Sequence, residues 1–232
     1  MLINLRNALM AGKRKPTAKD YVQDGLVAMW DGIENAGWGV HNPSATTWKD
    51  LINSRDLSVS DQATWENDGL AITQRITGGI AYSSLYFSDS DIVSIEVGFD
   101  LSSDSSNGQG RALFCNSNNR SVMGNGLDGI RSRGAQSVWS ARDLNGKFTA
   151  SVIYASSASG DAIYCDGVSK STNEAAGNWN NSLYIRIGSK SLNNKSISII
   201  GKCYFVRLYS RALTADEIAR NYAIDKERFN LP

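Results

Sequence analysis

The feature that most constrains the fold is an apolar strand that leads straight into a capped helix near the C-terminus. Residues 202–210 are rich in aromatic and β-branched side chains and carry few charges, so both faces of this strand are expected to be apolar. We therefore expect it to lie inside a sandwich and not at a wet edge. Alternation predicts one face made of Cys203, Phe205, Arg207 and Tyr209 and another made of Tyr204, Val206 and Leu208.

A short helix is predicted directly after this strand. Thr214 is a good N-cap, and Glu217 three residues later completes a capping box. The apolar spacing predicts that the buried side of the helix carries Ile218, Ala219, Tyr222 and Ala223. One capped helix after a core strand is an unusual ending for a chain that otherwise reads as β.

Residues 201–222 also carry a resemblance to a known family. The run VRLYSRALT at 206–214, preceded by Gly201-Lys202 and followed by Glu217-Ile218 and Asn221-Tyr222, resembles the closing signature of laminin-G-like, concanavalin A-like jelly rolls. Residues 25–30 and 48–57 resemble the opening strands of that family, so the resemblance covers roughly residues 25–229. It implies an all-β jelly-roll β-sandwich, a fold that hosts lectins, glycosidases, lyases and structural modules.

The strand pattern of the middle of the chain agrees with a two-sheet sandwich. Ile95, Val97, Phe99 and Leu101 alternate with polar or small residues such as Glu96, which predicts one wet face. The same period recurs in Phe148, Ala150, Val152 and Tyr154. Strands are predicted at residues 26–30, 57–59, 70–73, 79–82, 92–101, 111–115, 129–132, 137–141, 147–155, 162–165, 183–188 and 199–210. A dozen strands at this spacing with only three prolines favour a two-sheet sandwich or jelly roll. No fixed-length repeat is visible, which disfavours a propeller or solenoid.

The N-terminus is predicted to be separate from the sandwich. Residues 1–11, from Met1 to Ala11, read as a short amphipathic helix, and residues 12–20 read as a polar linker broken by Pro16. We thus divide the chain into an N-terminal helical arm and linker at 1–20 and one jelly-roll domain at 21–232. Eleven residues are too few to be stably helical alone, so the arm either folds back on its own domain or docks elsewhere, for example in a homo-oligomer.

Composition limits partners and compartment. The formal charge of +1 gives no basic field for nucleic acid, and no apolar run approaches the ~20 residues of a membrane span. Arg6 interrupts the N-terminal apolar run and the basic residues 13–15 follow it, so no signal peptide is expected. Localisation stays open, with association with a virion as one option. The cysteines Cys115, Cys165 and Cys203 are far apart and are expected to be buried, unpaired thiols.

No catalytic constellation is apparent in the sequence. Glu96 and Asp100, four apart on one strand, would lie ~13 Å apart, too far for a retaining or inverting glycosidase pair. His41 is the only histidine, and no nucleophile motif accompanies it. We expect a chain that is not an enzyme, with a polysaccharide hydrolase or lyase on the same fold as the alternative.

No cofactor is expected. The nearest calcium motif is the set of oxygen donors Asp100, Ser102, Asp104 and Asn107, but Ser105 and Ser106 replace the turn glycine and Arg111 replaces the bidentate glutamate. A solvated hairpin loop is the favoured interpretation, which leaves calcium as a weak option.

Sugar binding is the remaining hypothesis, because lectin sites combine an aromatic plate with a few placed polar groups. Of six tryptophans, Trp30, Trp48 and Trp65 are expected in the core. The candidate ligand-binding residues are Trp38 and His41 in one amide-rich loop, Trp139 in a short polar strand, and Trp179 in a second amide-rich loop. The alternative for the loop tryptophans is that they pack as lids over the ends of the sandwich.

The sequence thus predicts a recognition or structural module that contacts a glycan or another surface protein. A phage or prophage particle, as a tail-associated protein, is the setting in which such modules are commonly deployed. This setting follows from the resemblance and from no individual residue.

Overall fold

The computed structural model describes residues 14–83, 92–102, 111–115, 121–125, 129–133, 137–140, 145–154, 162–172, 185–189 and 198–232. For residues 111–112, 115, 121–125, 129–133, 137–140 and 171–172 only the backbone is described. The predicted arm at residues 1–11 lies outside these ranges, so the proposed homo-oligomer through it stays a prediction. No helix in the described part of the chain is long and apolar enough to span a membrane.

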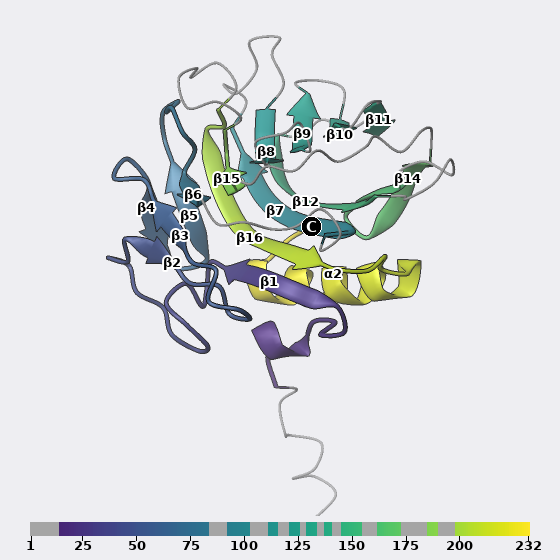
Figure 1. The fold of residues 1–232 in the computed structure, drawn as a ribbon, viewed down its shortest axis with the longest axis horizontal. Coiled ribbons are helices and arrows are strands. Elements are labelled where there is room, and N and C mark those ends of the chain that lie inside the picture. The colour runs from purple at the N-terminus through teal and green to yellow at the C-terminus, as the bar shows by residue number, and fades with distance from the viewer. Residues whose placement is uncertain are drawn as a thin grey trace, which may run out of the picture.

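Two antiparallel sheets make up most of the structure (Figure 1). The first sheet has the order β14 (Val168–Thr172), β13 (Ala162–Cys165), β12 (Gly146–Ile153), β7 (Ser94–Leu101), β16 (Gly201–Tyr209), β5 (Gly69–Ile72) and β4 (Thr64–Glu66), and β1 (Leu26–Asp31) also pairs with β16. The second sheet has the order β11 (Ser137–Ser140), β10 (Gly129–Arg133), β9 (Ser121–Asn125), β8 (Arg111–Cys115), β15 (Ile185–Ile187), β6 (Ala81–Ser83), β3 (Leu57–Val59) and β2 (Thr47–Trp48).

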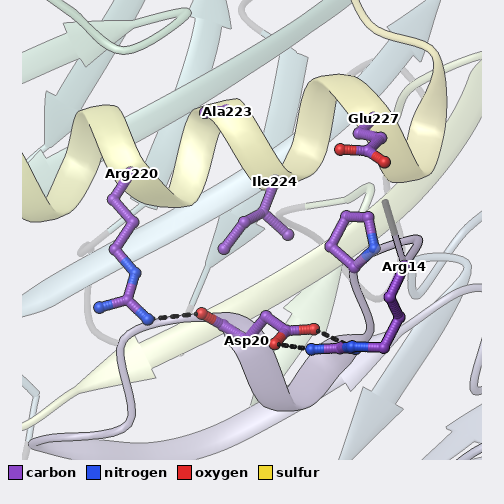
Figure 2. A pocket seen from close by; sticks show the side chains of 7 residues that line it. Arg14, Asp20, Arg220, Ala223, Ile224 and Glu227 are labelled. Carbon is purple, nitrogen blue, oxygen red and sulfur yellow. Dashed lines mark hydrogen bonds and ion pairs between the residues drawn. The ribbon is translucent and has the colours of Figure 1, made fainter. Parts of the chain in front are cut away.

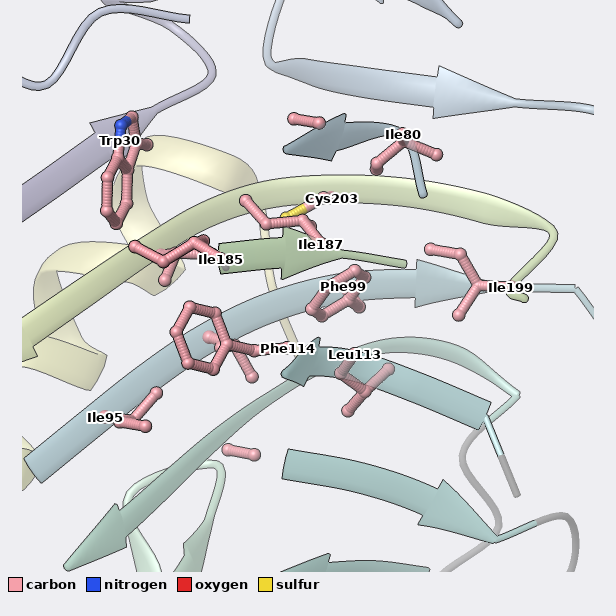
Figure 3. Packing of buried hydrophobic residues seen from close by; sticks show 14 of the residues in the cluster. Trp30, Ile80, Ile95, Phe99, Leu113, Phe114, Ile185, Ile187, Ile199 and Cys203 are labelled. Atoms are coloured by element: carbon pink, nitrogen blue, oxygen red, sulfur yellow. The ribbon is translucent and has the colours of Figure 1, made fainter. Parts of the chain in front are cut away.

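One hydrophobic core lies between the two sheets. Phe99 of β7 and Phe114 of β8 enter it from opposite sheets (Figure 3). Trp30, Trp48 and Trp65 are buried in the same core, as predicted, and burying a large apolar side chain stabilises a fold by roughly 1.5–3 kcal/mol. The all-β prediction, with two antiparallel layers and one C-terminal helix, is therefore confirmed.

The strand β16 lies in the interior of the first sheet, as expected, but the predicted faces are wrong at its start. A register shift between Cys203 and Phe205 marks a β-bulge, and a bulge redirects the side chains on either side of it. Cys203 faces the core with Val206, whereas Tyr204 and Phe205 both pack against the C-terminal helix.

That helix, α2 (Ala215–Phe229), begins as predicted. The Thr214 hydroxyl accepts a hydrogen bond from the Glu217 amide at 3.3 Å, and the Glu217 carboxylate accepts one from the Thr214 amide at 2.9 Å. The predicted buried side is correct only at Ile218. The residues that the helix buries are Ile218, Asn221, Asp225 and Phe229, whereas Ala219 and Ala223 are exposed and Tyr222 is half-buried.

The polar buried side of α2 matches the strand that it covers. The outer face of β7, predicted to be wet, lies under the helix, and Glu96 on that face is only 2% exposed. Gly98 on the same face is required there, because a Cβ atom would lie 2.4 Å from the ring of Phe205. The alternating pattern of β7 is therefore real, but its polar face is covered by α2.

The predicted strand bounds differ from the observed ones by at most two residues, within the usual uncertainty of strand ends. Four strands were not predicted: β2, β4, β9 and β14. Two of them have only two or three residues, and β9 (SVMGN) and β14 (VSKST) are polar and lack a clear apolar alternation.

Candidate ligand-binding surface

A buried ionic cluster joins α2 to the first sheet. It consists of Glu96, Arg207, Asn221 and Asp225. The Arg207 guanidinium donates hydrogen bonds to Glu96 at 2.9 Å and to both carboxylate oxygens of Asp225 at 2.8 and 2.7 Å. Asn221 donates to Glu96 at 2.8 Å. The side chains of the three charged members are at most 3% exposed.

This cluster contains a carboxyl group with a perturbed pKa, as many functional sites do, but it is not accessible to a ligand. Burial raises the pKa of Glu96, and Arg207 opposes that change; a pKa perturbed in this way marks functional-site candidates. However, Glu96 also accepts from Ser151 at 3.2 Å, and Asp225 accepts from the Tyr21 hydroxyl at 2.7 Å. Every carboxylate oxygen of the cluster is engaged beneath a helix, so we assign the cluster a structural role.

The loop at residues 34–42, here the Trp38 loop, lies on the surface and is internally bonded. The Glu34 carboxylate accepts from the Gly39 amide at 2.8 Å, and the side chain of Asn35 forms two hydrogen bonds to the backbone of Asn42 at 2.9 and 2.7 Å. Gly39 has φ +70°, a value that favours glycine. The loop thus presents Trp38 in a defined position, with 38% of it exposed.

One charged side chain lies over the Trp38 ring, and two other residues of the loop are relevant to binding. The Lys19 ammonium lies 5.3 Å from the centre of its ring, within the range of a cation–π contact. Val40, in the same loop, is 51% exposed. His41 is half-buried, and neither of its ring nitrogens has a hydrogen-bond partner in the part of the chain that the structure describes.

A hollow of about 260 Å³ lies at the end of the Trp38 loop. Hydroxyl, amide and ammonium groups line it together with two alanines; its lining residues are Ala36, Asn42, Ser44, Ala45, Thr46, Thr47 and Lys49. The Lys49 ammonium also forms an ion pair with Asp56 at 2.5 Å. The hollow is therefore polar, with many groups suited to hydrogen bonding.

A row of side chains continues from this hollow across the outer face of the second sheet. The outer row consists of Thr47, Ser58, Tyr82 and Arg186, which are paired in register across β2, β3, β6 and β15. Its members point away from the core because their chain neighbours Trp48, Leu57, Ala81 and Ile187 are buried in it. Three strand spacings separate Thr47 from Arg186, a distance of about 14 Å.

The outer row combines exposed and shielded groups. Tyr82 is 44% exposed and Ser58 is exposed, whereas Arg186 is 92% buried although it lies on the outer face. Thr47 belongs both to the row and to the hollow. The Trp38 loop, the hollow and the outer row together form the candidate ligand surface.

The structure places the sequence-predicted site residues in different regions. Trp38 and His41 lie in one loop. Trp139 lies on β11 opposite Arg131, at the edge of the second sheet furthest in strand order from β2, and only its backbone is described. Trp179 lies outside the described residues. The ligand-binding roles of all four remain predictions.

Sequence reasoning missed Tyr82, Ser58 and Thr47. The segment at 81–83, Ala-Tyr-Ser, carries the signal of an outward aromatic residue between two inward positions. What the sequence lacks is the register that aligns Tyr82 with Ser58 and Arg186, because pairing between distant strands is set by the whole sheet.

The remaining sequence predictions concern metals and thiols. In the described ranges, no group of three or more His, Cys, Asp or Glu residues could hold a metal ion; the candidate calcium donors Asp104 and Asn107 lie outside those ranges. Cys165 and Cys203 are buried and take part in no disulfide of the described residues, as predicted. The side chain of Cys115 lies outside the described part.

Comparisons with known proteins place the fold. No family model matches the chain, and no curated protein matches its sequence. Trypanosoma rangeli sialidase in complex with 2,3-difluoro-KDN is similar in structure, with a TM-score of 0.64, 14% identity, and coverage of 97% of this chain and 38% of that chain. The same sialidase in complex with sialic acid gives a TM-score of 0.62 and 16% identity over 93% of this chain and 34% of that chain.

A smaller carbohydrate-binding module is a weaker match. It is the Ruminococcus gnavus IT-sialidase CBM40 bound to α2,3-sialyllactose, with a TM-score of 0.47 and 12% identity over 64% of this chain and 95% of that chain. The chain spans little more than a third of the sialidase chains that it matches. It therefore shares the fold of one part of these sialidases.

Proposed function

We propose that this chain is a non-catalytic recognition module that binds a glycan, or a surface that carries glycans, through the candidate ligand surface. The observation that carries the proposal is the exposed Tyr82 on the outer face of the second sheet, in register with Ser58 and Arg186. The polar hollow adjoins the outer row at Thr47.

The chemistry of this surface suits a sugar. Sugars are bound by an aromatic ring against their apolar face and by a few fixed polar groups at their hydroxyls. Tyr82 provides such a ring, Ser58 provides a hydroxyl on the neighbouring strand, and Thr47 provides a second one strand further along the row. Asn42 and Ser44 extend the polar groups into the hollow, and Trp38 is a second exposed ring. Groups on paired strands and in a bonded loop lose little freedom on binding.

The solved structures support the glycan class. The similar Trypanosoma rangeli structures are described as sialidase in complex with sialic acid or its difluoro analogues. The proposal includes the laminin-G-like, concanavalin A-like jelly-roll type of sandwich, supported by two stacked antiparallel sheets closed by β16 and α2. It also includes deployment on a phage or prophage particle, which rests on the family resemblance alone.

A non-catalytic role is supported by the state of the buried carboxylates. Arg207 holds Glu96 and Asp225 between the first sheet and α2, and each of their four carboxylate oxygens accepts a hydrogen bond. Glycosidases need two carboxyl groups that flank a bound sugar, one of which keeps a transferable proton.

A glycan array probed with the full-length chain tests the proposal. We expect binding by the wild type, and at least a tenfold loss in Tyr82→Ala and in Trp38→Ala. The matched control is Tyr222→Ala, a half-buried tyrosine of α2 that belongs neither to the Trp38 loop nor to the outer row, and it should bind as the wild type does.

Two outcomes would overturn the proposal. The first is that the wild type binds no glycan on the array. The second is that bound oligosaccharides are cleaved, detected as new reducing ends or unsaturated products; that result would favour the alternative of a polysaccharide hydrolase or lyase.

A further inference from the structure

One buried carboxylate, Glu34, connects its own loop to two other segments, one 16 residues away at Ala18 and one 194 residues away at Arg228. Its oxygens accept hydrogen bonds from the Gly39 amide in the Trp38 loop at 2.8 Å, from the Ala18 amide of the short helix η1 (Ala18–Asp20) at 3.0 Å, and from the Arg228 guanidinium of α2 at 3.0 Å. Glu34 is 6% exposed. The two oxygens have different partners: Oε2 accepts from the Trp38 loop, and Oε1 accepts from η1 and α2.

The side chain of Arg228 is also held by a second carboxylate, that of Asp31. Its guanidinium donates to both carboxylate oxygens of Asp31 at 2.7 and 3.1 Å, and its side chain is 3% exposed. Asp31 in turn accepts from the Glu34 amide at 3.0 Å. A planar guanidinium can bridge two carboxylates in this way, whereas an ammonium acts as a single point charge.

The N-terminal linker is also held along α2. Arg14 forms a two-pronged hydrogen bond with the Asp20 carboxylate at 2.9 and 2.6 Å, and Arg220 of α2 donates to the Asp20 carbonyl at 2.9 Å (Figure 2). These groups border a second hollow, of about 360 Å³, between linker and helix. Beside Asp20, Lys19 lies over the ring of Trp38. Linker, helix and loop therefore meet at Glu34 and Trp38.

We infer that Glu34 and Arg228 are positioning residues, which hold the Trp38 loop in its ligand-ready shape and couple that shape to the N-terminal linker. The ligand in this inference rests on the proposed function, whereas the coupling does not. A displacement of the linker or of the end of α2 removes a donor from Glu34 Oε1, and the same carboxylate then loses the orientation in which Oε2 holds Gly39.

Two conservative variants isolate this role. Glu34→Gln keeps the size of the side chain but replaces one acceptor oxygen with an NH₂ group, which then faces an N–H donor from one of the three segments. Arg228→Lys keeps the charge but cannot bridge Asp31 and Glu34. The control is Arg211→Lys, because Arg211 makes a similar two-pronged contact with Glu217, at 2.8 and 2.6 Å, near the first turn of α2 and away from Glu34.

The test is amide hydrogen exchange, resolved by residue, on the full chain without ligand. We expect the Gly39 amide to exchange at least tenfold faster in Glu34→Gln and in Arg228→Lys than in the wild type. The amide of Leu51, which bonds to the Met29 carbonyl, should keep its rate, as should Gly39 in Arg211→Lys. Acrylamide quenching of the Trp38 fluorescence, taken as the difference from matched Trp38→Phe proteins, should rise in the same two variants.

Two results would overturn the inference: an unchanged Gly39 rate in both variants, or an equal acceleration in Arg211→Lys, which would indicate general loosening of α2. Because these measurements use no sugar, their failure is distinct from a failure of the glycan array. If the array confirms binding, Glu34→Gln should also weaken it; full affinity with a loosened loop would contradict the positioning role.

Discussion

The outer faces of the two sheets have similar alternating strand patterns but differ in their exposure to solvent. On the first sheet, α2 covers the polar side of β7 and β16, and Glu96 and Arg207 are 2% and 1% exposed. On the second sheet, the polar side of β3 and β6 remains open, with Tyr82 44% exposed. Alternation therefore shows which positions avoid the core, but not whether water or another element meets them.

Because α2 covers only one of these faces, the two faces are expected to contribute differently to stability and to ligand binding. Charges that are shielded from water must be paired, and removing one partner leaves the other uncompensated. On the open face, Tyr82 and Ser58 are exposed to solvent and are available to a ligand. We therefore expect substitutions on the covered face to change stability and substitutions on the open face to change binding.

The largest expected effect is at Arg207. Arg207→Ala leaves Glu96 and Asp225 buried without their cation, which should lower the free energy of unfolding by about 3–5 kcal/mol. Urea-induced unfolding followed by tryptophan fluorescence measures this change. A loss below about 1 kcal/mol would show that the helix does not seal this face.

A smaller loss is expected from Gly98→Ala. The added methyl group would lie 2.4 Å from the Phe205 ring beneath α2, and overpacking of this kind costs about 1–3 kcal/mol. The same unfolding experiment applies. Wild-type stability would mean that Phe205 has room to move and that the packing under the helix is loose.

The pH dependence should have opposite signs at two glutamates. Burial raises the pKa of Glu96, so its contribution to stability is present below its unfolded value, near 4.5, and is lost as pH rises through the folded value. Hydrogen bonds from Arg211 lower the pKa of Glu217 to about 2, so its contribution is present above 4.5 and is lost as pH falls toward 2.

Unfolding measured between pH 3 and pH 7 compares these two sites. As the pH falls, the stability cost of Glu96→Gln should grow and that of Glu217→Gln should shrink. Slopes of the same sign would contradict the assignment of Glu96 to a desolvated site and Glu217 to a solvated helix cap.

The smallest change in stability is expected on the open face. Tyr82→Ala should alter the free energy of unfolding by no more than about 0.5 kcal/mol, as is usual for surface positions. A loss above 2 kcal/mol in the same urea experiment would show that Tyr82 packs structurally and is not free to meet a ligand.

Much of the first sheet could be predicted from local sequence, because its strands are long and their core residues alternate. The phenylalanines of β7 and β12, the buried tryptophans and the Thr214 cap all follow from patterns within a few residues. The buried side of α2 could not be predicted in this way, since Asn221 and Asp225 face the first sheet only because Glu96 and Arg207 lie beneath them. An arginine in an apolar strand was the available signal.

The candidate ligand surface was predicted only in part, for a related reason. Trp38 stands out in its loop, flanked by glycines. Tyr82 does not, because its importance depends on pairing with Ser58 and Arg186 on strands that are 24 and 104 residues away in the chain. Glu34 likewise has an unremarkable sequence context, and its role depends on Arg228 near the other end of the chain.

The most direct test of the account is a map of backbone amide chemical shifts during titration with the glycan that binds most strongly on the array. We predict shifts at Ser58, Tyr82 and Val40, on the open face and the Trp38 loop, with Ala219 and Ala223 of α2 unchanged. Shifts confined to α2, or to strands of the first sheet, would contradict the claim that the exposed side of β3 and β6 is where this molecule meets its ligand.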